Sequence, residues 1–136
     1  MTPGQRLAKE AAALIGTRFR LNGRQPEYGL DCVGLLVVAL TRAEVTVSDP
    51  VGYALRNLSI EPWLNCAKAS SLTDARGPVI AGDILLVVPG AAQSHILIAE
   101  SERSFVHAHA GLGKIVRHAA DLPWPILRHW RLDRQF

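Results

Sequence analysis

The chain has 136 residues, of which 49% are hydrophobic and 20% are charged, a balance that excludes wholesale disorder and indicates a single globular domain spanning residues 1–136. The net charge of +3 is small, and no aromatic platform is interleaved with the basic residues, so we expect no nucleic-acid partner. The longest apolar run, residues 32–40, is about half of what a membrane span requires, so we expect no membrane span.

The first residues do not resemble a secretory signal, because charged side chains interrupt an alanine-rich segment. We therefore expect a protein that is cytoplasmic as synthesised. The two cysteines, Cys32 and Cys66, cannot form a disulfide scaffold and are expected to be free thiols in a reducing compartment.

The first half of the chain is predicted to be helical. Thr2 can cap a helix whose apolar face continues to Leu14 and Ile15, and Gly16 is a natural stop. Residues 17–30 contain turn-forming glycine, asparagine and proline and indicate a loop. Asp31 then predicts the N-cap of a buried helix from Cys32 to about Arg42.

After this helix the sequence no longer shows long helical segments. Residues 48–78 are punctuated by proline and glycine, with one or two short helices expected around 53–58 and 61–69. Five short β-type segments follow, at residues 83–88, 95–100, 104–109, 114–118 and 126–132. Helices first and strands afterwards predict an α+β domain with a largely antiparallel sheet.

The most informative position is Cys32, which the pattern places in the first turn of a buried helix. Unpaired backbone N–H groups and the helix dipole at that end favour thiolate over thiol. Gly34, two residues on, leaves room for another backbone or a substrate to approach. The alternative is that Cys32 is simply a small buried side chain, as free cysteines often are.

Histidines on the predicted strands could complete the chemistry of a cysteine nucleophile. His95 begins one strand and His107 lies inside the next, so two adjacent strands can present the two rings side by side. His109 shares the face of His107 but lies nearer a turn and is expected at the rim. His118 and His129 lie among arginines and are expected to be surface groups.

A metal site is the alternative use of these residues. His107 and His109 could supply two ligands on one strand face, with Cys32 or His95 completing a zinc set. No CxxC or HExxH spacing supports that arrangement, and Cys66 is expected in a helix core, so we expect neither metal nor cofactor.

Four short motifs in this order resemble the NlpC family of papain-like cell-wall cysteine peptidases. They are Asp-Cys-Val-Gly-Leu at 31–35, Gly-Asp-Ile-Leu at 82–85, Ser-His-Ile-Leu-Ile at 94–98 and Phe-Val-His-Ala at 105–108. Residues 16–24 resemble the subgroup encoded by phages, prophages and gene transfer agents. The resemblance implies the papain-like fold, in which N-terminal helices, including the one bearing the nucleophile, pack on a central antiparallel sheet of about five strands.

By position, the resemblance implies that Cys32 is the nucleophile, His95 the general base and acid, and His107 the polar third member. It also implies substrate contacts around these residues, from Asp31, which could hold the amino end of a stem peptide or only cap the helix, and from Phe19, Val33, Gly34 and Ser94. Many family members have serine where this chain has Val33, and a tyrosine at the position of Phe19.

The function implied is hydrolysis of amide bonds in peptidoglycan stem peptides, commonly between D-glutamate and diaminopimelate. Two alternatives stay open: a non-catalytic phage tail protein that keeps the fold, and another papain-like Cys/His amidase or acyltransferase. The resemblance further implies carriage to the cell wall in a phage or gene-transfer-agent particle, with tail proteins as partners.

The C-terminal segment offers a candidate docking face for such partners. Its arginines and tryptophans are of the types enriched at interfaces, namely Trp124, Arg128, Trp130, Arg131 and Arg134. The alternative is that the two tryptophans belong to the core and the arginines to a solvated strand.

Overall fold

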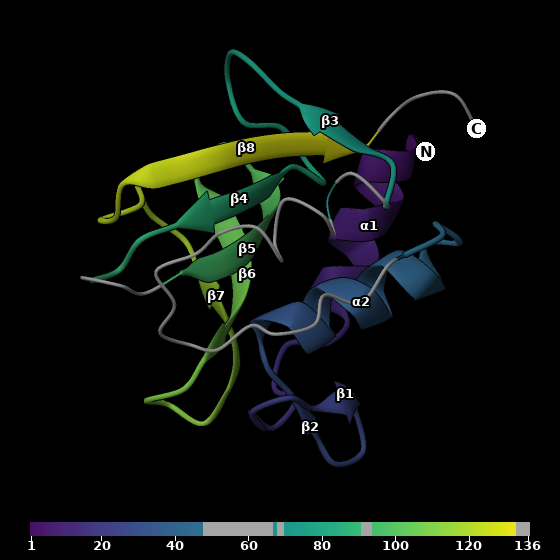
Figure 1. The fold of residues 1–136 in the computed structure, drawn as a ribbon, viewed down its shortest axis with the longest axis vertical. Coiled ribbons are helices and arrows are strands. Elements are labelled where there is room, and N and C mark those ends of the chain that lie inside the picture. The colour runs from purple at the N-terminus through teal and green to yellow at the C-terminus, as the bar shows by residue number, and fades with distance from the viewer. Residues whose placement is uncertain (48–66, 68–69, 91–93, 133–136) are drawn as a thin grey trace.

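The computed structural model describes residues 1–47, 67, 70–90 and 94–132 and shows two helices against one antiparallel sheet (Figure 1). The helices are α1 (Pro3–Ala12) and α2 (Cys32–Arg42), and a two-stranded hairpin, β1 (Arg24–Gln25) and β2 (Gly29–Leu30), lies between them. The strands of the sheet are β3 (Leu72–Asp74), β4 (Ile84–Val87), β5 (His95–Ser101), β6 (Ser104–His109), β7 (Lys114–His118) and β8 (Ile126–Leu132).

The sheet has the order β3-β8-β4-β5-β6-β7, and every neighbouring pair is antiparallel. Both helices lie on one face, where their apolar residues form the main core with the inward residues of the strands. A smaller cluster on the other face is built from Leu85, Val87, Leu97, Ala99 and Phe105 and is covered in part by Leu122 and Trp124. The predicted α+β class is confirmed.

Helix α2 is largely buried, as its apolar sequence predicts. Seven of its residues are buried, and Val37 and Val38 pack against the core from half-buried positions. No helix in the described part of the chain is both long enough and apolar enough to cross a membrane.

Three differences from the sequence-based expectation have physical causes. Helix α1 ends at Ala12 rather than near Gly16, because the N–H groups of Leu14 and Ile15 bond carbonyl groups only three residues back. Gly16 follows with φ +94° and donates its N–H to Ile115 O in β7. The sheet has a sixth strand, β3, whose three residues form a strand only by pairing with β8. The expected loop contains the hairpin β1–β2. The helices expected around 53–58 and 61–69 fall, apart from Ala67, outside the described residues.

Candidate active site

The N-terminus of α2 is held by the buried carboxylate of Asp31. Its Oδ1 accepts the Gly34 N–H at 2.8 Å, which caps the helix, and its Oδ2 accepts the Asn22 N–H at 2.8 Å. Arg24 adds an ion pair at 3.2 Å. These contacts fasten the start of the β1–β2 hairpin and the turn before it across the start of the helix, so the first residue of α2 has a defined place.

Close backbone packing completes this arrangement. A Cβ on Gly34 would lie 2.0 Å from the carbonyl oxygen of Gly23, so only glycine lets the loop approach the helix this closely. The room expected beside Gly34 is therefore filled by another stretch of backbone.

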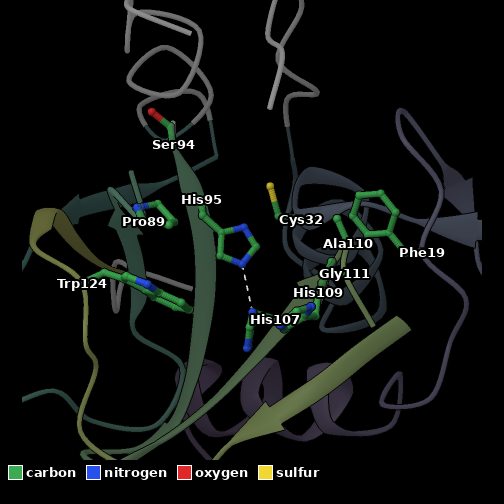
Figure 2. A pocket seen from close by; sticks show the side chains of 11 residues that line it. Phe19, Cys32, Pro89, Ser94, His95, His107, His109, Ala110, Gly111 and Trp124 are labelled. Atoms are coloured by element: carbon green, nitrogen blue, oxygen red, sulfur yellow. Dashed lines mark hydrogen bonds between the residues drawn. The ribbon is translucent and has the colours of Figure 1, made fainter. Parts of the chain in front are cut away.

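Cys32 is the first residue of α2 and faces a pocket of about 360 Å³ between the helix and the sheet (Figure 2). The opposite wall comes from β5 and β6, and Phe19 and Trp124 lie at two sides. The lining residues are Phe19, Cys32, Pro89, Ser94, His95, His107, Ala108, His109, Ala110, Gly111 and Trp124. Cys32 and its two predicted partners, His95 and His107, therefore meet in one cavity.

His95 and His107 are joined by a hydrogen bond of 2.9 Å between His95 Nε2 and His107 Nδ1. The opposite edge of the His95 ring faces the Cys32 sulfur (Figure 2). If His95 is to accept a proton at Nδ1, its neutral form must carry the hydrogen on Nε2 and donate it to His107. The hydrogen bond fits donation in either direction, so we assign this tautomer from the role of His95, with His107 protonated on its own Nε2.

Both imidazoles are held in the neutral form. Burial lowers the pKa of His95 to about 3, and the neighbouring His107 and His109 lower it further in the same direction. Burial likewise lowers the pKa of His107 to about 4, with His109 and His118 as the next causes. An unprotonated His95 is the state that a general base requires.

Cys32 differs from the expectation of a stabilised thiolate. The residue is only 1% exposed, and burial, followed by the charge of Asp31, raises the pKa of its thiol to about 12. Hydrogen bonds with backbone groups of Ile96, Val33 and Cys32 act in the opposite direction but are outweighed. The resting pair is therefore thiol and neutral imidazole, and the expected effect of the helix terminus is overcome by desolvation.

The remaining histidines are also placed by specific partners. His109 lies half-buried at the pocket edge, where its Nδ1 accepts the Leu112 N–H at 3.0 Å. His118 and His129 are not free surface groups as expected. His118 is half-buried beside Trp124, and His129 bonds to the buried Asp83 at 2.6 Å.

The other residues expected to contact substrate divide into two groups. Phe19 and Ser94 line the pocket, although the Ser94 side chain points away from Cys32 in Figure 2. Asp31, Val33 and Gly34 are buried behind the helix start and do not line it. Sequence reasoning did not assign Pro89, Ala110, Gly111 or Trp124 to the site, because each lies in a loop whose path no local pattern specifies.

The candidate docking face does not form one surface. Trp130 is 4% exposed and belongs to the main core, whereas Trp124 lines the pocket. Arg131 is bound to Asp83, and Arg134 lies outside the described residues. The alternative that Trp130 is a core residue is confirmed.

Metal coordination was the competing use of these side chains. In the ranges that the structure describes, no three or more histidine, cysteine or acidic residues are grouped so that they could hold a metal ion.

This architecture is similar to that of several solved structures. No protein-family model and no curated protein matches the chain. Solved structures do match: NlpC2 from Trichomonas vaginalis has a TM-score of 0.70 at 17% identity over 96% of this chain and 48% of its own. The P60 domain of an antigen from M. avium subspecies paratuberculosis has a TM-score of 0.65 at 14% identity over 98% of this chain and 96% of its own.

A third structure, the NlpC/p60 domain of the peptidoglycan hydrolase SagA, has a TM-score of 0.59 at 23% identity, covering 85% of this chain and 88% of that domain. The chain thus has the papain-like α+β fold, in the form found in NlpC/P60 domains. It spans about half the length of the Trichomonas protein.

Proposed function

We propose that the chain is a cysteine peptidase that hydrolyses amide bonds in peptidoglycan stem peptides. The observation that carries this proposal is the meeting of Cys32, at a helix N-terminus, with the hydrogen-bonded pair His95–His107 in one pocket. The likeness of fold to NlpC/P60 domains, one of them from a protein named as a peptidoglycan hydrolase, supports the choice of substrate.

In the proposed reaction the Cys32 sulfur attacks the amide carbonyl as its proton passes to His95 Nδ1. Transfer during attack, rather than from a preformed thiolate, follows from the pKa of about 12 for the thiol. His95 then protonates the departing amine, the C–N bond breaks, and a thioester remains on Cys32. Water that gives a proton to His95 hydrolyses the thioester and restores the thiol.

His107 and the helix start assist this cycle. His107 accepts the Nε2–H of His95, which keeps the Nδ1 lone pair directed at the sulfur. The Cys32 backbone N–H, which as a first-turn donor has no partner within the helix, can stabilise the oxyanion. For the bond itself we propose the one between D-glutamate and diaminopimelate, which the sequence resemblance implies.

The test is hydrolysis of defined stem peptides by the purified chain, with products identified by mass spectrometry. We expect cleavage by the wild-type protein and by Cys66→Ala, and none by Cys32→Ala. The second cysteine is the matched control for loss of a thiol. Absence of cleavage by a folded wild-type chain would favour the non-catalytic alternative, and transfer of the acyl group to an added amine would favour an acyltransferase.

We further propose that the protein, once made in the cytoplasm, reaches the cell wall in a phage or gene-transfer-agent particle, docked on tail proteins. The resemblance of residues 16–24 to the particle-encoded subgroup supports this proposal. Proteomics of purified particles tests it, since we expect the chain to co-purify with tail proteins. Its recovery from the cytosolic fraction alone would contradict this route.

A further inference from the structure

The ring of Trp124 contacts three histidines around the pocket, and the proposed reaction gives it no role. Its ring centroid lies 6.2 Å from that of His95, 5.9 Å from that of His107 and 6.1 Å from that of His118. The planes of His95 and His107 are inclined to the indole by 89° and 75°. One indole therefore contacts both members of the hydrogen-bonded histidine pair.

The position of Trp124 is set by packing from behind. It lies in the segment between β7 and β8 and packs with Leu122 against the smaller apolar cluster of the sheet. In Figure 2 it lies on the opposite side of the His95 ring from Cys32. The indole thus covers the histidine pair on the side away from the Cys32 sulfur.

The hydrogen bond between the two rings needs such a cover. His107 is 3% exposed, but His95 is only half-buried, so water that reached Nε2 could replace His107 as the hydrogen-bond partner. A His95 ring bonded to water can turn and can exchange its two tautomers. Only the form with hydrogen on Nε2 presents a lone pair to Cys32.

We propose that Trp124 is a positioning residue that excludes water from the His95–His107 hydrogen bond and so fixes the orientation and tautomer of His95. The consequence for hydrolysis rests on the proposed function, whereas the shielding itself does not. Removing the indole lowers the fraction of His95 that presents its Nδ1 lone pair to Cys32, so turnover falls.

A matched control is available within the same segment. Leu122 packs on the same cluster as Trp124 but is not among the described residues that line the pocket. Leu122→Ala therefore loosens the segment without uncovering the pair. Trp124→Phe keeps a flat aromatic cover, and Trp124→Leu removes it.

The test is NMR of protein labelled with ¹⁵N in histidine, which reports the tautomer of each ring and the exchange of its N–H proton with water. The ring proton of His118, which donates to Asp121 O in an exposed hydrogen bond, is the internal reference in the wild type. Each variant is compared with the wild-type His95 proton, because Trp124 also contacts His118. In the wild type we expect the His95 proton to exchange about tenfold more slowly than the His118 proton. Trp124→Leu should raise its exchange by about tenfold and mix the tautomers, whereas Trp124→Phe and Leu122→Ala should preserve both.

Several outcomes would overturn the inference. In the wild type, a His95 proton that exchanges as fast as that of His118 would do so, and this measurement requires no variant to fold. An unchanged exchange rate of the His95 proton in Trp124→Leu would also overturn it. So would an equal rise in that rate in Leu122→Ala. Because the readout uses no substrate, a chain with a protected proton but no hydrolysis would contradict the proposed function and leave the shielding in place.

Discussion

Two clusters of polar side chains that include histidine lie on the same sheet and differ in the charged groups around the histidine. In the pocket, His95 bonds to another imidazole at 2.9 Å, and no lysine, arginine or carboxylate is among the described residues that line the cavity. At the other site, which we call the Asp83 cluster, the buried carboxylate of Asp83 receives His129 at 2.6 Å and Arg131 through two bonds of 2.8 Å.

The difference lies in charge compensation. Burial alone would raise the pKa of Asp83, but hydrogen bonds from Arg131, the Ile80 N–H and His129 outweigh it and hold the pKa below its ordinary value. In the pocket no fixed charge compensates for burial, and the histidines stay neutral. A closed ionic cluster fastens strands, whereas a neutral pair beside a cavity can take up a proton during a reaction.

The largest effect that this contrast predicts is on activity. His95→Ala should lower stem-peptide hydrolysis by about 10³-fold or more, because it removes the only proposed acceptor for the thiol proton. His129→Ala, the matched change in the Asp83 cluster, should leave the rate per folded molecule within about threefold. Steady-state kinetics on a defined stem peptide, with folding checked by circular dichroism, measures both. Equal losses of activity in His95→Ala and His129→Ala would contradict the proposed difference between the two clusters.

The next effect is on stability. Asp83→Ala should lower the free energy of unfolding by about 2–4 kcal/mol, because it leaves Arg131 and His129 without their buried acceptor. The control is Asp121→Ala, which removes an exposed carboxylate paired with Arg103 and should cost less than about 1 kcal/mol. Urea denaturation distinguishes them, and equal costs would show that the Asp83 cluster fastens nothing.

Within the pocket the two neighbours of His95 should differ. His107→Ala should lower turnover by about 10- to 100-fold, less than His95→Ala, because an orienting partner can be replaced in part by water. His109→Ala should change it by less than about threefold, since His109 bonds to the Leu112 backbone rather than to His95. A severe loss in His109→Ala with a near-normal His107→Ala would reverse these roles.

The two clusters should also lose stability in different pH ranges. His95 and His107 have ordinary pKa values of 6.5 that folding lowers to about 3 and about 4, so the unfolded chain binds protons first as pH falls below 6.5. Keeping the two rings neutral should cost about 1 kcal/mol of stability for each ring, or about 2.5 kcal/mol together, between pH 7 and 5.5. The contribution of Asp83, whose pKa is lowered from 3.8, should be lost only below that value.

Thermal denaturation of the wild type and of a His95→Gln, His107→Gln double variant tests these ranges. The double variant should lose less stability between pH 7 and 5.5. Identical pH dependence of the two proteins would show that the pocket histidines are not held neutral.

The smallest effect is expected on the pH profile of activity. Because the pKa of His95 is about 3, the base stays unprotonated at pH 5.5, and kcat/KM per folded molecule should change by less than about twofold between pH 5.5 and 8. A fall centred near pH 6.5 would mean that His95 titrates as an ordinary, uncovered histidine.

Much of the fold could be predicted because its signals are local. An uninterrupted apolar run after Asp31 specifies the buried helix α2, and alternating β-branched segments specify β6, β7 and β8 at the observed bounds. Strand β3 has no such pattern and depends on its partner β8. The path of residues 16 and 17, which follow α1, depends in the same way on hydrogen bonds to β7.

The candidate site was predictable where motif order carries it. Cys32, His95 and His107 are brought together as their positions on a helix start and two adjacent strands imply. The effect of burial on Cys32 could not be read from the helix terminus alone, because burial depends on the sheet packed against it. The partners of His129 and Trp124 likewise come from segments distant in sequence.

The central claim is that Cys32 forms a covalent acyl intermediate. A stem peptide with an activated ester in place of the scissile amide tests it directly, because fast acylation lets the thioester accumulate. Mass spectrometry of the acid-quenched, digested protein should find the acyl mass on the peptide that contains Cys32, and none in Cys32→Ala. Ester cleavage with no adduct on Cys32, or with the same adduct rate in the alanine variant, would contradict the account.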